Sequence, residues 1–170
     1  RNTGQTCVCA NRVYVQEKVY DEFCQKFVEA VSKVKVGDGL DEAVASGPLI
    51  DEHSLSKVEE HVQDAVQMGA KVAIGGSRHE LGMNFYQPTI LTDVTPQAKI
   101  TSEETFGPVA PVYKFKDEQE VIELANNSPY GLASYFYSRD IGRIWRVAEA
   151  LEYGMVGVNT GLTSKAEAPF

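Results

Sequence analysis

Hydrophobic and polar positions change their period several times along the chain, and each change predicts a new element. Residues 11–16 alternate polar and apolar side chains, which predicts a strand. Apolar residues then recur every three or four positions, which predicts an amphipathic helix over about residues 19–34. A second helical stripe runs to about residue 68, with Asp51 or Ser54 as its N-cap and Gly69 as its terminator. The chain therefore begins as strand, helix, helix.

The same alternation continues to the C-terminal end. Short strands are expected at 71–74, 109–115, 133–137 and 154–158, an extended segment at 85–91, and helices at 117–126 and 141–151. Pro111 has no N–H to donate, so we expect it at the start of its strand or in an edge position. Strands that alternate with helices predict an α/β fold with a mostly parallel sheet and helices on both faces.

Composition narrows the class of protein. A chain of 170 residues with 43% hydrophobic residues suits one soluble domain with a real core. The net charge of −8 argues against nucleic acid or an anionic membrane as a partner, although one local arginine could still bind a small anion. No apolar run approaches the roughly 18 residues of a transmembrane helix. Three cysteines, an odd number, favour a reducing compartment over a disulfide framework.

Candidate chemistry is concentrated in the first nine residues, which hold two of the three cysteines. Cys7 follows a Gly-Gln-Thr sequence that favours a tight turn, and these polar surroundings favour a reactive thiol over a small buried side chain. His53, His61 and His79 stand in no motif that would supply a base, and we expect His61, beside the apolar stripe of its helix, to be a surface or boundary residue. No metal site is expected. The residues alone therefore predict a possible nucleophile.

Residues 1–12, with Gly-Gln-Thr-Cys at positions 4–7, resemble the nucleophile motif of the aldehyde dehydrogenase superfamily, in its succinate-semialdehyde dehydrogenase branch. Further stretches that are similar to the family follow in the family's order, at residues 47–50, 75–76, 87–89, 103–108, 130–133 and 154–159. The resemblance covers essentially the whole chain. It implies the fold of the aldehyde dehydrogenase catalytic domain.

The resemblance implies a role for three residues. Cys7 is the nucleophile whose thiolate adds to the aldehyde, giving a thiohemiacetal, then hydride loss to NAD or NADP, then a thioester that water hydrolyses. Glu104 accepts hydrogen bonds from the nicotinamide ribose, and Phe106 packs near the ring. Glu103, beside them, is expected to be a solvated carboxylate. No G-x-G-x-x-G motif is present, so only the resemblance indicates the cofactor.

The same branch implies the substrate, succinate semialdehyde, and with it a role in GABA degradation. A buried carboxylate needs a cation or several donors, and Arg1 matches the arginine that the branch uses, with Ser164 as a second donor. Glutarate semialdehyde or another short aldehyde stays open as an alternative. So does a reading in which the 170-residue chain alone is a catalytically inactive domain.

Three further expectations follow from the resemblance. Residues 1–170 are expected to be a catalytic-domain fragment, with the cofactor-binding domain and the general base elsewhere in a homo-oligomeric parent. That parent would act in the cytoplasm of a bacterium or the mitochondrial matrix of an animal. Cys9 is a candidate redox-switch partner of Cys7, because some members of the branch bridge this pair. The bridge needs a turn at residues 7–9, since an extended strand would separate the two Cβ atoms.

Overall fold

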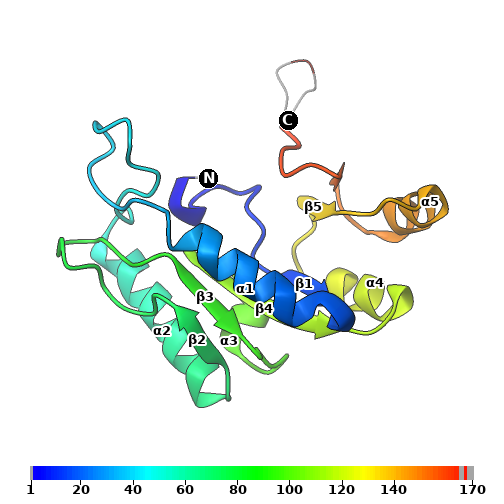
Figure 1. Ribbon diagram of the computed structural model, residues 1–170, viewed down its shortest axis with the longest axis horizontal. Coiled ribbons are helices and arrows are strands. Elements are labelled where there is room, and N and C mark those ends of the chain that lie inside the picture. Colours follow the sequence, from blue (N-terminus) through cyan, green and yellow to red (C-terminus); the bar gives the residue numbers. More distant parts are fainter. Residues whose placement is uncertain (1, 165–166, 168–170) are drawn as a thin grey trace. The chain divides into compact units, whose positions relative to one another are not determined.

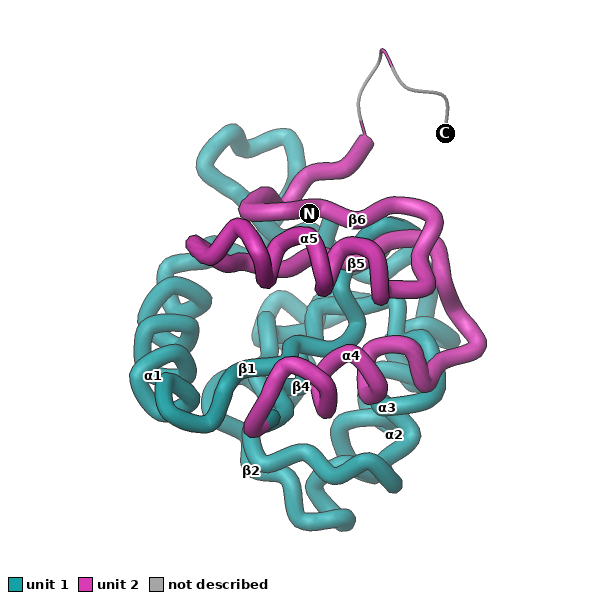
Figure 2. The backbone as a smooth tube through the Cα atoms, turned by 90° about the vertical axis from the view of Figure 1, so that its right-hand side faces the viewer, with its two compact units in different colours: residues 1–115 teal, residues 116–170 magenta. Residues whose placement is uncertain are grey.

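The computed structural model describes residues 2–164 and residue 167. The chain separates into two compact units, Arg1–Phe115 and Lys116–Phe170, which Figure 2 shows in teal and magenta. The first unit contains three α-helices and four strands among the described residues: β1 (Val13–Gln16), α1 (Tyr20–Val31), α2 (Glu52–Gln67), β2 (Lys71–Ile74), β3 (Thr89–Thr92), α3 (Lys99–Ser102) and β4 (Val109–Phe115). Two short 3-10 helices, Asn2–Gly4 and Glu17–Val19, precede β1 and α1.

The four strands of the first unit form one sheet in the order β1-β4-β3-β2. β4 runs parallel to both of its neighbours, and β2 is antiparallel to β3. Consecutive residues of a strand point to opposite faces, and on β3 Ile90 and Leu91 belong to different cores. Ile90 packs with side chains of α1, whereas Leu91 packs with side chains of α2 and α3. Figure 1 shows these three helices around the sheet. Helices on both faces of a largely parallel sheet confirm the predicted α/β class.

Pro111 contradicts the expectation of a strand start or an edge. It lies in the middle of β4, which is an interior strand, and its side chain is fully buried. β4 pairs with β3 over residues 109–111 and with β1 over residues 112–115. Pro111 therefore stands where β4 changes partners, and the missing N–H falls at the end of one ladder just before the other begins.

Local sequence features predicted both ends of α2 correctly. The Asp51 side chain accepts a hydrogen bond from the Ser54 N–H, 2.7 Å away, so Asp51 is the N-cap of α2 as expected. Gly69 has φ +103° directly after the last turn, which confirms it as the terminator. α1 is shorter than predicted, because residues 17–19 form a separate 3-10 turn and the helix ends at Val31.

The second unit contains α4 (Glu118–Asn126), β5 (Ala133–Phe136), α5 (Ile141–Ala150) and β6 (Met155–Val158). β5 and β6 pair in parallel. Asp117 and Asp140 cap the two helices by accepting hydrogen bonds from the N–H groups of Glu120 and Arg143. Among the described residues, no helix combines the length and the apolar character that a membrane crossing requires.

Candidate active site

Cys7 is exposed at the tip of a turn, as the Gly-Gln-Thr sequence predicted. The Gln5 N–H donates to the Asn2 carbonyl oxygen at 2.9 Å, and the Cys9 N–H donates to the Thr6 carbonyl oxygen at 3.0 Å. Asn2, Thr3 and Gly4 all have positive φ, so the chain coils tightly before it reaches the thiol. Within the described residues, the Cys7 side chain is therefore open to solvent.

The motif residues before Cys7 anchor the turn to residues 46–50. The Thr3 hydroxyl accepts a hydrogen bond from the Gly47 N–H at 3.1 Å. The Gln5 side chain donates to the Pro48 carbonyl oxygen at 3.1 Å and accepts from the Ile50 N–H at 2.9 Å. Because the Gln5 amide satisfies one donor and one acceptor of the same loop, it holds the turn in a single orientation.

Gly4 brings the turn against the segment that carries Glu104 and Phe106. A Cβ atom on Gly4 would lie 2.0 Å from the Gly107 carbonyl oxygen, and Gly4 has φ +75°. Only glycine allows this approach. Gly107 is itself pressed against α2, since a Cβ there would lie 2.5 Å from a Val58 methyl group. Sequence positions 4 and 107 thus meet, and the turn before Cys7 lies against Gly107, at the end of the segment that carries Glu104 and Phe106.

Glu104 and Phe106 line a hollow of about 290 Å³ together with His53, Ser54 and Lys57 from the start of α2. Phe106, 37% exposed and with φ 55°, also lines a neighbouring hollow of about 480 Å³ beside Asn2 and Gln5. Lys57 was not singled out from the sequence. Its signal was available in the helical spacing, because residues 53, 54 and 57 share one face of α2.

His61 does not lie at the surface, and that expectation was wrong. Its side chain is buried, with 1% exposure, because residues 58, 61, 62 and 65 form the inward stripe of α2. Its Nδ1 lies 3.0 Å from the Thr105 hydroxyl and its Nε2 lies 3.3 Å from a Glu103 carboxylate oxygen. Burial lowers the pKa of His61, and the nearby Glu103 opposes that shift only in part. Glu103 keeps a half-exposed side chain but is not merely solvated.

The family model of the aldehyde dehydrogenases matches residues 1–170, the entire chain. This chain belongs to the aldehyde dehydrogenase family. It is 61% identical over 170 residues to the succinate-semialdehyde dehydrogenase [NADP(+)] GabD of Escherichia coli K12, covering 100% of this chain and 35% of that protein. It is 59% identical, with the same coverage, to a glutarate-semialdehyde dehydrogenase of Pseudomonas aeruginosa.

Solved structures agree with these relatives. A succinate-semialdehyde dehydrogenase from Burkholderia pseudomallei superposes on this aldehyde dehydrogenase chain with a TM-score of 0.98 and 57% identity, over 100% of this chain and 35% of that one. Betaine aldehyde dehydrogenase from Staphylococcus aureus in complex with NAD+ gives a TM-score of 0.94 at 38% identity, over 99% of this chain and 34% of that one. The chain thus spans about 35% of the length of its relatives.

Cys9 of this aldehyde dehydrogenase lies in a turn and not in a strand. The Cys9 N–H closes the turn on the Thr6 carbonyl oxygen, and the half-buried Cys9 sulfur shares a 2.8 Å hydrogen bond with the Thr6 hydroxyl. Of the two geometries considered for residues 7–9, the turn is the one in which two sulfurs two positions apart can approach each other.

The two candidate carboxylate-binding residues are placed differently. Arg1 lies outside the described residues. Ser164 is exposed and belongs to the second compact unit, whereas Cys7, Glu104 and Phe106 belong to the first. Within the described part of the chain, no group of three or more His, Cys, Asp or Glu side chains is arranged to hold a metal ion.

Proposed function

We propose that the full-length protein oxidises a short semialdehyde, foremost succinate semialdehyde, with NAD or NADP. The observation that carries this proposal is the packing of Gly4 on Gly107, which sets the exposed Cys7 turn directly against the segment of Glu104 and Phe106. A nucleophile next to a cofactor-binding segment is what aldehyde oxidation through a covalent intermediate requires. The names of the relatives support the same activity.

The chemistry assigned to this chain begins at Cys7. Its thiolate forms a C–S bond to the aldehyde carbon, and the carbonyl electron pair moves to the oxygen. Backbone N–H groups of the turn, that of Cys7 among them, are candidate donors to this oxyanion. The later hydrolysis needs a base, which the family resemblance places outside these 170 residues. The role of this chain is therefore to capture the aldehyde and to hold the cofactor.

The residues around the 290 Å³ hollow fit a nicotinamide nucleotide. Glu104 can accept hydrogen bonds from ribose hydroxyls, Phe106 offers an aromatic face, and Lys57 adds a cation near the phosphates or the ribose. When bound, the nicotinamide supplies the acceptor for the hydride that the substrate carbon releases. One relative is named for NADP(+) and one structure holds NAD+, so both nucleotides belong in the test.

For the substrate we propose a terminal carboxylate bound by Arg1, with Ser164 as an added donor. Glutarate semialdehyde is the second candidate, because a relative of that name is 59% identical to this chain. We propose a homo-oligomer in the cytosol of a bacterium, or in the mitochondrial matrix of an animal, as relatives named mitochondrial in human and rat suggest.

The test is a steady-state assay of the full-length protein with aldehydes that carry or lack a terminal carboxylate. Arg1→Ala should raise KM for succinate semialdehyde about 10- to 150-fold, since a hydrogen bond to a charged group contributes roughly 1.5–3 kcal/mol. The KM for uncharged aldehydes of the same length should not change. Equal losses for charged and uncharged aldehydes would refute the carboxylate site, and full activity in Cys7→Ser would refute the mechanism.

We also propose that Cys9 resolves oxidised Cys7. Peroxide converts the Cys7 thiolate to a sulfenic acid, and attack by the Cys9 thiol expels water and forms a disulfide, with a net loss of two hydrogens. Wild type should lose activity in mild peroxide and regain it in dithiothreitol, with the matching mass change. Cys9→Ala should be inactivated without that mass change or full rescue; identical behaviour of the two proteins would exclude the switch.

A further inference from the structure

The buried His61 contacts both sequence neighbours of Glu104. Its Nδ1 reaches the Thr105 hydroxyl at 3.0 Å, and its Nε2 reaches the Glu103 carboxylate at 3.3 Å. Glu103 and Thr105 flank Glu104, the residue proposed to bind the ribose. The imidazole therefore contacts the chain on both sides of Glu104. Thr105 is itself 4% exposed, which means that its hydroxyl must find a partner within the protein.

The atoms allow one consistent pattern of donors and acceptors. The Glu103 carboxylate can only accept, so the His61 Nε2 carries the hydrogen that it donates to Glu103. The neutral ring then leaves Nδ1 as an acceptor for the Thr105 hydroxyl. The other charged groups that influence the ring are Lys57 and Glu60, both on α2. With its two nitrogens used in this way, the imidazole joins a rigid helix to an otherwise irregular segment.

His61 lies on the helix that lines the 290 Å³ hollow. His61 follows Lys57 by one turn of the helix, and Lys57 lines the same hollow as Glu104 and Phe106. The segment around Glu104 has no ladder to hold it, since residues 103–108 precede β4 and belong to no strand. Through Glu103 and Thr105, His61 therefore links the chain on both sides of Glu104 to α2, the helix that lines the same hollow.

We propose that His61 is a positioning residue for the dinucleotide: by holding Glu103 and Thr105 it orients Glu104 toward the cofactor hollow. This inference rests on the proposed function, because it assigns His61 to cofactor binding by the same site. It predicts a defect in nucleotide affinity, separate from the reactivity of Cys7. The Cys7 turn is held through Thr3, Gln5 and Gly4 and makes none of these contacts.

The experiment uses the full-length protein and its variants His61→Leu, His61→Gln and Thr105→Val. The Kd values for NADH and NADPH are measured by fluorescence without aldehyde, and the nucleotide that wild type binds more tightly is used for the variants. The rate at which iodoacetamide alkylates Cys7 is measured without cofactor. His61→Leu and Thr105→Val should each raise the Kd about three- to tenfold, as expected for a lost hydrogen bond to a buried partner. His61→Gln, which keeps a donor for Glu103, should recover part of the affinity. Cys7 alkylation should change less than twofold.

Controls separate positioning from general damage. His79→Gln, in the hairpin after β2, should leave both the Kd and the alkylation rate unchanged. The double variant His61→Leu/Thr105→Val should be no weaker in affinity than the worse single variant, because both remove the same contact. Thr105→Val keeps the volume of the side chain and removes only the hydroxyl. Its Kd therefore tests the His61–Thr105 contact even if His61→Leu does not fold.

The outcomes distinguish this inference from the function on which it rests. Wild type that binds NADH or NADPH and oxidises aldehydes, together with an unchanged Kd in folded Thr105→Val and His61→Gln, would overturn the role of His61 and leave the proposed function standing. Equal losses of nucleotide affinity and of Cys7 reactivity would overturn it as well, since they would indicate a general distortion. Wild type that binds no dinucleotide would overturn both proposals.

Discussion

At the residue scale, the motif around Cys7 consists mainly of residues that hold the thiol in place. Thr3 and Gln5 use their side chains to anchor the turn, and Gly4 lets it lie on the Gly107 carbonyl. Cys7 is the one member of this group with the chemistry of a nucleophile. The spacing of this motif therefore reflects packing requirements as well as the placement of the thiol.

Gly4→Ala should destabilise the protein more than Gly82→Ala. Both glycines have positive φ, +75° and +71°, but a Cβ on Gly82 meets nothing within 4 Å, whereas one on Gly4 would collide with the Gly107 oxygen. We expect Gly82→Ala to cost about 1 kcal/mol through backbone strain, and Gly4→Ala about 1–3 kcal/mol more, with loss of activity. Urea unfolding of the two variants measures the difference; similar midpoints would show that the turn can move away from residue 107.

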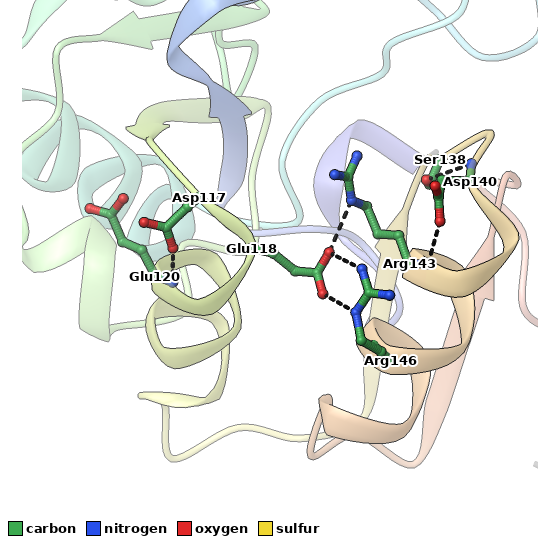
Figure 3. Close-up of polar contacts among 7 residues, drawn as sticks. All are labelled: Asp117, Glu118, Glu120, Ser138, Asp140, Arg143 and Arg146. Carbon is green, nitrogen blue, oxygen red and sulfur yellow. Dashed lines mark hydrogen bonds and ion pairs between the residues drawn. The ribbon is translucent and has the colours of Figure 1, made fainter.

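At the scale of elements, side-chain caps and ion pairs connect neighbouring helices. In the second unit, Glu118 at the start of α4 accepts hydrogen bonds from Arg143 and Arg146 of α5, with distances between 2.7 and 3.0 Å (Figure 3). The two arginines lower the pKa of Glu118 to about 2, Arg146 contributing most. One carboxylate thus joins two helices that are also capped by Asp117 and Asp140.

Glu118→Gln should lower the Tm of the second unit at pH 7. A carboxylate whose pKa is depressed on folding stabilises the native state above its unfolded pKa, about 4.3 for glutamate, and loses this effect as pH falls toward about 2. The Tm difference from wild type should therefore shrink below about pH 4.3, and also in high salt, because the pair is solvent-screened.

The fluorescence of Trp145, the one tryptophan of the sequence, reports unfolding of α5 directly. Glu149→Gln, an exposed glutamate of the same helix, serves as the control for loss of charge alone. A difference between wild type and Glu118→Gln that persists unchanged at low pH or in high salt would contradict an electrostatic link.

At the scale of the whole molecule, the chain holds part of what the family uses. It spans about 35% of the length of its relatives, and its first unit contains Cys7, Glu104 and Phe106. We propose that the general base and the remaining cofactor contacts lie in other parts of the full-length protein. We therefore expect the 170-residue chain to keep a reactive Cys7 thiol while lacking catalytic turnover.

The 170-residue chain alone should show no dehydrogenase turnover with NAD or NADP and succinate semialdehyde. Iodoacetamide should still alkylate Cys7, because the thiol is exposed on its turn. Absorbance at 340 nm follows turnover, and mass spectrometry follows alkylation, with the full-length protein as the positive control. Turnover by the chain that disappears in Cys7→Ser would contradict this prediction.

Much of the fold was predictable, because the signals that define it are local. The period of apolar residues located each long helix and most strands, and Asp51 and Gly69 marked the two ends of α2. The α/β class followed from the order of elements. The exposed turn at Cys7 also followed from its own neighbours in the sequence.

Long-range contacts decided the rest. The sequence by itself determined the elements, the family and the nucleophile candidate, since each depends on a short stretch of chain. Only the tertiary structure placed Pro111 inside the sheet, buried His61 against Thr105, and brought Gly4 to Gly107. The physical reason is that strand order, burial and close approach depend on which distant segments pack together. The periodicity of apolar residues along the chain does not determine that packing.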